Sequence, residues 1–223
     1  MKKILIAIIF SAIYLVAPCQ QCASYFFEPK KIEWFHYNVR GNQDGTIIYT
    51  MLPQSIKDKA GNAGIKVQLY DVNQKLINAD NYTVKCQGQH ISVDMRFYLP
   101  AQQVEQYMTP ASKMKPAFLE YSSNLKSGDQ LKDGYFRVEN DENDLKQVLQ
   151  MTISRRTVKG MEHVTTPAGD WDCFKITYTL TLKLQTGPIT IPLTMEMTEW
   201  YAPSFGIVKK SSAEGYTEIN SIN

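Results

Sequence analysis

Two stretches of alternating side chains between residues 174 and 197 constrain the fold of this chain more than any other feature of its sequence. In both stretches a large apolar residue occupies every second position, and threonine, lysine and glutamate occur among the positions between. This period of two is typical of a β-strand that buries one face. Because a turn sequence, Thr186-Gly187-Pro188, separates the stretches, the pattern predicts a long hairpin with one apolar face, formed by Phe174, Ile176, Tyr178, Leu180, Leu182, Leu184, Ile189, Ile191, Leu193, Met195 and Met197.

The size of this hairpin limits how the other elements can be arranged. Folding about the turn predicts a register with Leu184 opposite Ile189 and Leu180 opposite Leu193. About twelve residues per strand, at roughly 3.3 Å each, give an arm of about 40 Å. A sheet this long and this apolar on one side must cover that side, either by curling or by packing against another layer. Pro192 lacks a backbone N–H donor, so its strand is expected near a sheet edge or a bulge.

Most of the remaining chain also shows strand patterns. Alternation predicts strands over residues 32–39, 46–52, 64–72, 76–86, 90–98, 135–139 and 147–154, and a short helix over 100–108. Their order and spacing favour a mainly β fold, in which an antiparallel meander forms a curled sheet, half-barrel or open barrel with at most one or two short helices. Without internal repeats or linkers, residues 20–223 are expected to form a single β-rich domain.

The N-terminus has the pattern of a signal peptide. Two lysines follow Met1, and residues 4–17 form an apolar run that is too short for a typical membrane-spanning helix. We expect residues 1–19 to be removed, with cleavage after Ala23 as the rival site. A lipid anchor on Cys19 is disfavoured because Pro18 stands where a lipoprotein signal has a small residue. The protein is therefore expected to be exported, to the periplasm or cell surface, and to be peripheral to the membrane at most.

Export makes disulfide bonds possible, and the mature chain would keep three cysteines. Cys86 shares the apolar parity of its strand, whereas Cys173 falls with Lys175 on the polar face of the long hairpin. Because a strand sends alternate side chains to opposite faces, a bond between Cys86 and Cys173 is disfavoured. The pattern favours a Cys22–Cys86 disulfide with Cys173 free, and three reduced thiols remain the alternative.

Charge and motifs exclude several classes of function. After removal of Lys2 and Lys3, Lys+Arg falls from 24 to 22 and equals the 22 Asp+Glu, so the mature chain gives no electrostatic reason to bind nucleic acid. The sequence has no H-E-x-x-H zinc motif, no G-x-S-x-G nucleophile motif and no glycine-rich phosphate loop. We therefore expect no catalytic residues, no metal site, no cofactor and no enzymatic activity.

Several motifs resemble one known family. VTTPAGDWDCFKITYT (164–179), EWYAPSFGIVKKSS (199–212) and EGYTEI (214–219) are similar to an exported family of unknown function from Bacteroides-type bacteria, the domain of unknown function 3108-like family. SNLKSGDQLKDG (123–134) and CASYFFEP (22–29) fit the same family, although Pro29 lies later than the family's usual Tyr-Phe-Pro start and the tail is short. The resemblance implies an envelope location, a mostly antiparallel β-fold and kinship with LolA-like half-barrels, and it supplies no reaction.

Two functions remain open. The protein either binds a lipid or other hydrophobic ligand, with the eleven apolar hairpin residues as its lining, or it is a structural or protein-interaction module of the envelope with a filled core. A void of several hundred Å³ inside the sheet favours the first and a dense core favours the second. An outer-membrane barrel is a weaker third reading, because the early strands are short and the prolines and the helix interrupt their succession.

The leader gives the first testable expectation. The exported protein should begin near Gln20, because the residues before it have the charged start, apolar run and small residues of a cleaved signal. Intact mass spectrometry of the exported protein measures this directly. A full-length chain recovered from the cytoplasm would contradict export.

Overall fold

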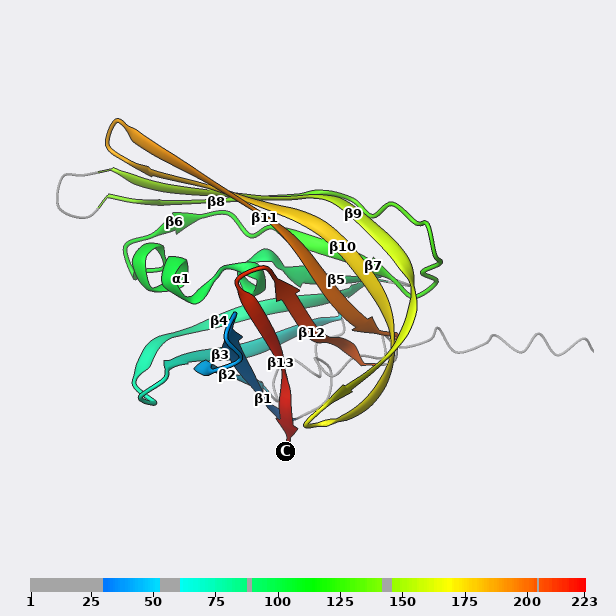
Figure 1. The fold of residues 1–223 in the computed structure, drawn as a ribbon. Coiled ribbons are helices and arrows are strands. Elements are labelled where there is room, and N and C mark those ends of the chain that lie inside the picture. Colours follow the sequence, from blue (N-terminus) through cyan, green and yellow to red (C-terminus); the bar gives the residue numbers. More distant parts are fainter. Residues whose placement is uncertain (1–29, 53–60, 88–89, 142–145, 204) are drawn as a thin grey trace, which may run out of the picture.

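The computed structural model describes residues 30–52, 61–87, 90–141, 146–203 and 205–223, and these form one antiparallel sheet of 13 strands with one α-helix and one 3-10 helix. The sheet curls around a core without closing into a barrel (Figure 1). This confirms the prediction of a mainly β, curled antiparallel meander with at most two short helices.

The first half of the chain supplies short and medium strands and both helices. The elements are β1 (Lys31–Asn38), β2 (Gln43–Met51), β3 (Asn62–Asp71), β4 (Leu76–Gln87), β5 (His90–Asp94), the 3-10 helix η2 (Met95–Tyr98), α1 (Ala101–Tyr107), β6 (Lys113–Met114) and β7 (Phe118–Ser122).

The second half contains the longest strands. They are β8 (Gly134–Asn140), β9 (Gln147–Thr166), β10 (Gly169–Thr186), β11 (Ile189–Ala202), β12 (Gly206–Ser212) and β13 (Gly215–Ile222). In Figure 1 the turn between β10 and β11 extends beyond α1 at one end of the molecule.

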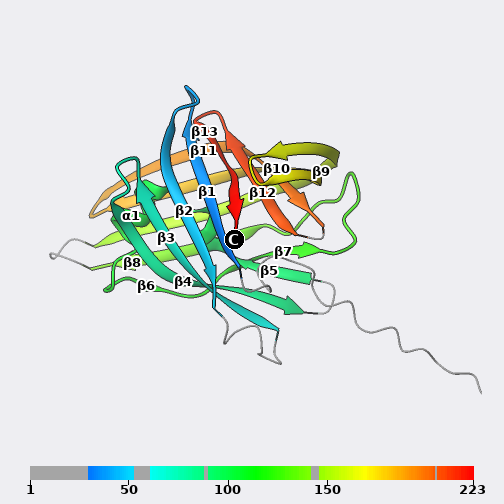
Figure 2. The same cartoon turned by 90° about the horizontal axis from the view of Figure 1, so that it is seen from below.

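The strand order brings both ends of the described chain to the middle of the sheet. The order is β6-β8-β9-β10-β11-β12-β13-β1-β2-β3-β4-β5-β7, so the last strand, β13, pairs with β1 on one side and β12 on the other (Figure 2). The two outermost strands, β6 and β7, are separated in sequence only by residues 115–117. Four Cα steps span at most about 14 Å. The opposite edges of the sheet are therefore close together.

Side chains fill the space between these edges. A Cβ placed on Gly134, the first residue of β8, would lie 2.5 Å from Cδ2 of Leu119 in β7 and 2.9 Å from Sδ of Met95 in η2. Glycine is therefore needed where β8 approaches β7 this closely. Arg156 of β9 also donates from Nη1 to the backbone oxygens of Glu120 in β7 and Lys132, at 3.2 and 3.1 Å. Side-chain packing and these hydrogen bonds take the place of a backbone ladder.

Bulges in β9 allow the long strands to bend. The β9–β10 register shifts at Lys175/Ile176 and between Thr177 and Thr179, each time with an extra residue in β9. Arg155 and Gly160, at these shifts, have φ of +57° and +149°. Bulges bend a strand and increase its twist, which lets 20 residues of β9 follow the curled surface. The sequence pattern predicted only residues 147–154 of this strand, because the bulges interrupt its alternation.

The predicted hairpin exists, but its register is wrong by two residues. Leu184 pairs with Ile191 and Leu180 with Met195, because the turn contains only Gly187 and Pro188. Gly187 has a φ of +56°, as expected for the first central residue of a two-residue hairpin turn. A shift of two preserves the faces, so the predicted apolar face is correct although its pairs are not.

The edge position predicted from Pro192 is confirmed. Pro192 pairs with Lys183 of β10, but the β11–β12 ladder begins only at Thr198. The outer part of β11, including Pro192, therefore has a neighbour on one side alone. A missing N–H donor costs nothing on the open side.

The predicted helix over 100–108 is confirmed as α1, whereas the predicted strand over 90–98 ends early. Asp94 stops it by accepting a hydrogen bond from the backbone N of Arg96 at 3.0 Å, which caps η2. Asp94 is polar but only 1% exposed, because its carboxylate also binds the Arg96 guanidinium.

The cysteines follow the predicted bonding in part. Cys86 is disulfide-bonded, and Cys173 is free. The predicted partner, Cys22, lies outside the described residues. The prediction that Cys173 lies on a polar face is wrong, because its side chain is fully buried. The bulge opposite Lys175 and Ile176 bends this end of the hairpin. The alternation seen in the straight part of the strand therefore no longer predicts which side chains are buried here.

This environment predicts an unreactive thiol. Burial raises the pKa of Cys173 to about 12, so little thiolate forms near neutral pH. A thiol reagent should react slowly with the native protein and should titrate one thiol per mature chain after denaturation without reductant. Cys173→Ser should remove that signal. Three reactive thiols in the denatured, unreduced protein would contradict the disulfide at Cys86.

Candidate functional site

The curled sheet and the η2–α1 segment enclose a cavity of about 460 Å³. Its walls come from β1–β4 and β12–β13 on one side and from β10–β11 on the other, and residues from Arg96 to Val104 close a third side. Figure 1 shows α1 between these two parts of the sheet. The cavity exists because η2 and α1 fill only part of the space inside the curl.

Most of the cavity wall is apolar or aromatic. Alternate residues of β2 and β3 point inward, and the apolar and aromatic lining comprises Ile47, Tyr49, Val67, Leu69, Ile77, Tyr82, Phe97, Tyr98, Leu99, Val104, Tyr178, Leu180, Met195 and Met197. Tyr49 and Tyr82 each meet the edge of the Phe97 ring, with centroids 5.1 and 4.9 Å apart. These contacts fix the aromatic part of the wall.

The eleven residues predicted as a ligand lining divide into three groups. Four of them line the cavity: Tyr178, Leu180, Met195 and Met197. The other β10 members and Leu193 pack in or against the core instead. Ile189 and Ile191 are 64% and 58% exposed, because the end of the hairpin extends past the elements that cover its inner face.

A row of polar residues crosses the inner face of the sheet and was not predicted from the sequence. Cross-strand pairing aligns the polar residues Glu199 of β11, Lys210 of β12, Thr217 of β13 and His36 of β1, and the row ends at Gly45 of β2. All but Glu199 line the cavity. The row runs from the exposed His36 at the mouth to the fully buried Glu199 inside.

The sequence carries one signal for this row. Glu199 continues the parity of Met195 and Met197, so a carboxylate occupies an otherwise apolar face. Lys210 gives no such signal, because two consecutive lysines such as Lys209 and Lys210 are also typical of a solvated strand end. Only the β11–β12 register places it opposite Glu199.

Behind the cavity lies a buried polar cluster formed by Arg156, Glu199, Tyr121 and Tyr98. Tyr121 donates to Oε1 of Glu199 at 2.7 Å and contacts the Tyr98 hydroxyl. Nη2 of Arg156 lies 3.9 Å from the same Glu199 oxygen, and both side chains have no exposed surface. Burial raises the pKa of Glu199, whereas Arg156 and the Tyr121 hydrogen bond oppose that shift.

Two polar groups on the cavity wall have unused hydrogen-bonding capacity. Nζ of Lys210 donates to the backbone oxygen of Phe97 at 2.9 Å and lies 5.3 Å from the centre of the Tyr98 ring, which leaves two further N–H donors. The Tyr178 hydroxyl is buried and has no hydrogen-bond partner among the described residues. The Lys210 ammonium can donate to a polar atom inside the cavity, whereas the Tyr178 hydroxyl oxygen has almost no accessible surface.

The mouth of the cavity is acidic. Asp44, Asp71 and Glu214 line it, and Asp44 contacts the imidazole of His36. Asp71 also accepts hydrogen bonds from the backbone N of residues 73 and 75, both at 2.9 Å, and so shapes the β3–β4 turn at the rim. Carboxylates therefore surround the entrance, whereas the interior holds an ammonium.

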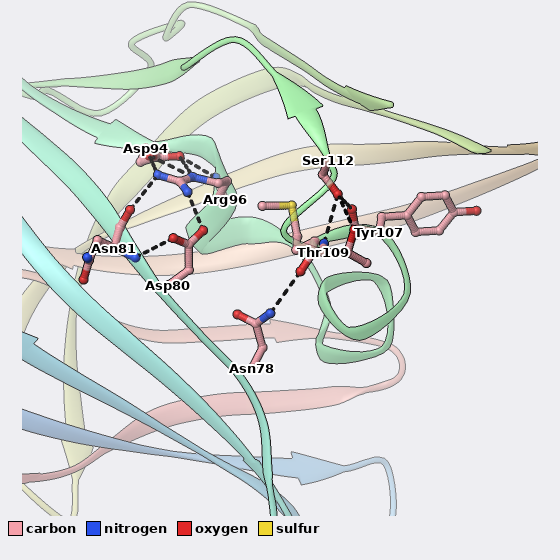
Figure 3. A network of polar contacts seen from close by, with 9 residues as sticks. Asn78, Asp80, Asn81, Asp94, Arg96, Tyr107, Thr109 and Ser112 are labelled. Atoms are coloured by element: carbon pink, nitrogen blue, oxygen red, sulfur yellow. Dashed lines mark hydrogen bonds and ion pairs between the residues drawn. The ribbon is translucent and has the colours of Figure 1, made fainter. Parts of the chain in front are cut away.

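A second polar network holds the η2–α1 segment in place (Figure 3). The Arg96 guanidinium donates to Asp94 Oδ2 and Asp80 Oδ2, both at 2.7 Å, and to the backbone oxygen of Asn81 at 3.0 Å. It also stacks over the Tyr82 ring at 4.3 Å. Arg96 lines the cavity, but its charge is already paired with Asp94 and Asp80. Its role is to hold η2 against β4.

The end of α1 is tied to β4 as well. Asn78 of β4 donates to the backbone oxygen of Met108 at 3.2 Å, and the Ser112 hydroxyl contacts the backbone around Tyr107 and Thr109 (Figure 3). These bonds and the Arg96 network are the polar attachments by which β4 holds the wall formed by residues 96–104.

Neither a metal centre nor a membrane span is found in the described part of the chain. Within it, no three His, Cys, Asp or Glu side chains are grouped to hold a metal ion. No helix in the same ranges is both long and apolar enough to cross a bilayer.

Comparisons with known proteins place this geometry in a family. Residues 28–222 match the family described as DUF3108-like. A candidate lipoprotein from Parabacteroides distasonis has a similar structure, with a TM-score of 0.72 and 19% identity over 90% of this chain and 99% of that chain. A candidate exported protein with a YmcC-like fold from Bacteroides fragilis has a TM-score of 0.70 and 20% identity over 88% of this chain and 96% of that chain. At these identities the likeness concerns the fold. No curated protein matches the sequence.

The buried lysine predicts an unusual dependence of stability on pH. Burial lowers the pKa of Lys210 to about 8, and the carboxylate of Glu199 only partly opposes this. Between about pH 8 and the unfolded value near 10.4, the folded protein binds fewer protons at this site than the unfolded chain. The contribution of Lys210 to the free energy of unfolding should therefore rise with pH in that window, by about 2 kcal/mol up to pH 9.5.

Chemical denaturation of wild type and Lys210→Met at pH 7 and 9.5 measures this effect. The difference between the two proteins is the quantity to compare, because it cancels other titrating groups such as Cys173. Lys209→Met is the matched control, since Lys209 pairs with Glu218 at 2.6 Å instead of lining the cavity. A wild-type minus Lys210→Met difference that does not change with pH would contradict the assignment.

Proposed function

The chain belongs to the DUF3108-like family, and from the cavity inside its curled sheet we propose that it is an exported, non-enzymatic protein of the cell envelope that binds a hydrophobic ligand such as a lipid. The cavity carries this proposal. Its volume of about 460 Å³ falls within the roughly 300–1,000 Å³ of small-molecule sites. Its wall combines apolar side chains with a few inward polar groups, as such sites do.

The wall suits a flexible apolar chain. Met195 and Met197 of β11 line the cavity together with Val67 and Leu69 of β3. Methionine adapts to ligands of varied shape because its side chain is unbranched and polarisable. Each ligand methylene moved from water into such a cavity contributes about 0.8 kcal/mol.

The location is supported by the sequence of the leader and by the neighbouring structures. One neighbour is described as a candidate exported protein and another as a candidate lipoprotein. Residues 1–29 lie outside the described residues, so the cleavage site and the absence of an anchor on Cys19 stay predictions. The lipoprotein description favours testing the anchor in the same mass measurement.

The alternative is a structural or protein-interaction module of the envelope. One observation favours it: Ile189 and Ile191 expose apolar surface at the end of the β10–β11 hairpin, on a strand edge that is unpaired on one side. The cavity favours ligand binding over this alternative, because a module that acts only through its surface has no need of an internal void.

The proposal predicts binding of a neutral hydrophobic probe inside the cavity. N-phenyl-1-naphthylamine should increase in fluorescence on addition to the purified protein, and native mass spectrometry of gently purified protein should show co-purified lipid. The double variant Met195→Trp/Met197→Trp should reduce dye affinity at least about tenfold, because the indoles occupy the ligand volume.

Leu193→Trp is the matched control. Leu193 lies on the same strand and face and packs against the core, but it does not line the cavity. It should keep wild-type dye affinity. If the folded wild-type protein neither binds the dye nor retains lipid, and added lipid leaves its melting temperature unchanged, ligand binding is wrong and the interaction module remains.

A further inference from the structure

The charges around the cavity identify the chemical class of the ligand, on the premise that the proposed binding function is correct. Two cations, Arg156 of the buried cluster and Lys210 of the cavity wall, accompany one carboxylate, Glu199. Arg156 and Tyr121 do not line the cavity, and both lie at the Oε1 oxygen of Glu199. At least one positive charge in the interior therefore has no carboxylate of its own. A buried charge is costly unless it is paired.

Lys210 is the cation that a ligand can reach. Among the described residues that line the cavity, the other permanent cation is Arg96, and its guanidinium is occupied by Asp94 and Asp80. Among the described residues, Lys210 has a single backbone oxygen as hydrogen-bond partner, at 2.9 Å, and it retains two donors.

An aromatic ring lies beside this ammonium. Nζ of Lys210 lies 5.3 Å from the centre of the Tyr98 ring, which lines the same cavity. The ring of Tyr178 also lines the cavity, but its hydroxyl oxygen has almost no accessible surface and does not reach the ligand space.

We infer that the ligand is a single-chain amphiphile with one terminal anionic group, bound head-inward so that this group meets the Lys210 ammonium. An ammonium can donate to a carboxylate or a phosphate oxygen. The apolar chain then runs along Leu180, Met195 and Met197 toward the mouth.

The acidic mouth fixes this orientation. An anionic group at the entrance would face Asp44, Asp71 and Glu214, which repel it. The same group at the inner end meets the positive charge that has no partner. Electrostatics at the two ends of the cavity therefore favour the same direction of insertion.

Three ligands of equal chain length test the inference: dodecanoate, dodecyl phosphate and dodecanol. Each displaces N-phenyl-1-naphthylamine from the wild-type protein at pH 7, and the displacement gives its affinity. The anionic ligand should bind at least about tenfold more tightly than dodecanol, the scale of a charge-assisted hydrogen bond. Comparison of dodecanoate with dodecyl phosphate distinguishes a fatty acid from a phosphate-bearing lipid as the source of the charge.

Two substitutions of one lysine locate the recognition. Lys210→Met and Lys210→Gln should each lower the affinity for the anion relative to that for dodecanol until the preference is lost. Lys209→Met, which removes a lysine outside the cavity, should retain the full preference. Lys210→Gln keeps a polar side chain and keeps the test valid if Lys210→Met does not fold.

The outcomes separate this inference from the proposed function. If the wild-type protein binds the dye and all three ligands with equal affinity, or if both variants keep the preference for the anion, the inference is overturned and the binding function stands. If the folded wild-type protein binds neither the dye nor any of the ligands, the binding function itself is wrong.

Discussion

The shape of this molecule depends on a small set of buried polar contacts that join the two ends of an open sheet. Arg156 of β9 donates to the backbone oxygen of Glu120 at the β7 edge, and Tyr121 of the same edge strand donates to Glu199 of β11. A barrel would satisfy its last strands with a backbone ladder. Here side chains take over that role, and removing either charge would leave its partner buried and unpaired, which typically costs about 3–5 kcal/mol. Tyr98 of η2 joins these contacts through the Tyr121 hydroxyl, and the cavity is the space that η2 and α1 leave unfilled.

The placement of η2 and α1 follows from the same constraint. Once Asp94 ends β5, the chain turns into the interior, and the Arg96 guanidinium fixes it there through Asp94, Asp80 and the Tyr82 ring. The backbone oxygen of Phe97 then lies where it accepts from Lys210. One short segment therefore connects the structural network of Figure 3 to the polar end of the cavity, so the stability of η2 and the geometry of the binding site depend on each other.

Much of the fold could be predicted from the sequence because strand alternation and turn residues are local signals. The apolar face of residues 174–197 follows from the period of two in the side chains. The open edge at Pro192 follows from the backbone N–H donor that proline lacks. The hairpin register could not be predicted, because a four-residue turn and a two-residue turn keep the same side chains on the same faces. The buried position of Cys173 and the length of β9 depend on bulges that the alternation does not reveal. The polar end of the cavity was missed for a related reason: Lys210 and Glu199 become neighbours only through the β11–β12 register.

A buried lysine also bears on the choice between the two functions. In a core that serves only stability, an apolar residue at position 210 would avoid the desolvation of an ammonium whose hydrogen-bond partner among the described residues is a single backbone oxygen. Arg156 and Tyr121 already lie at Oε1 of Glu199, so Lys210 is a second cation beside one carboxylate. Its charge lies at a cavity whose wall is mostly apolar. The destabilising group and the void coincide, and a ligand that carries the compensating charge explains both together, whereas a filled structural core explains neither.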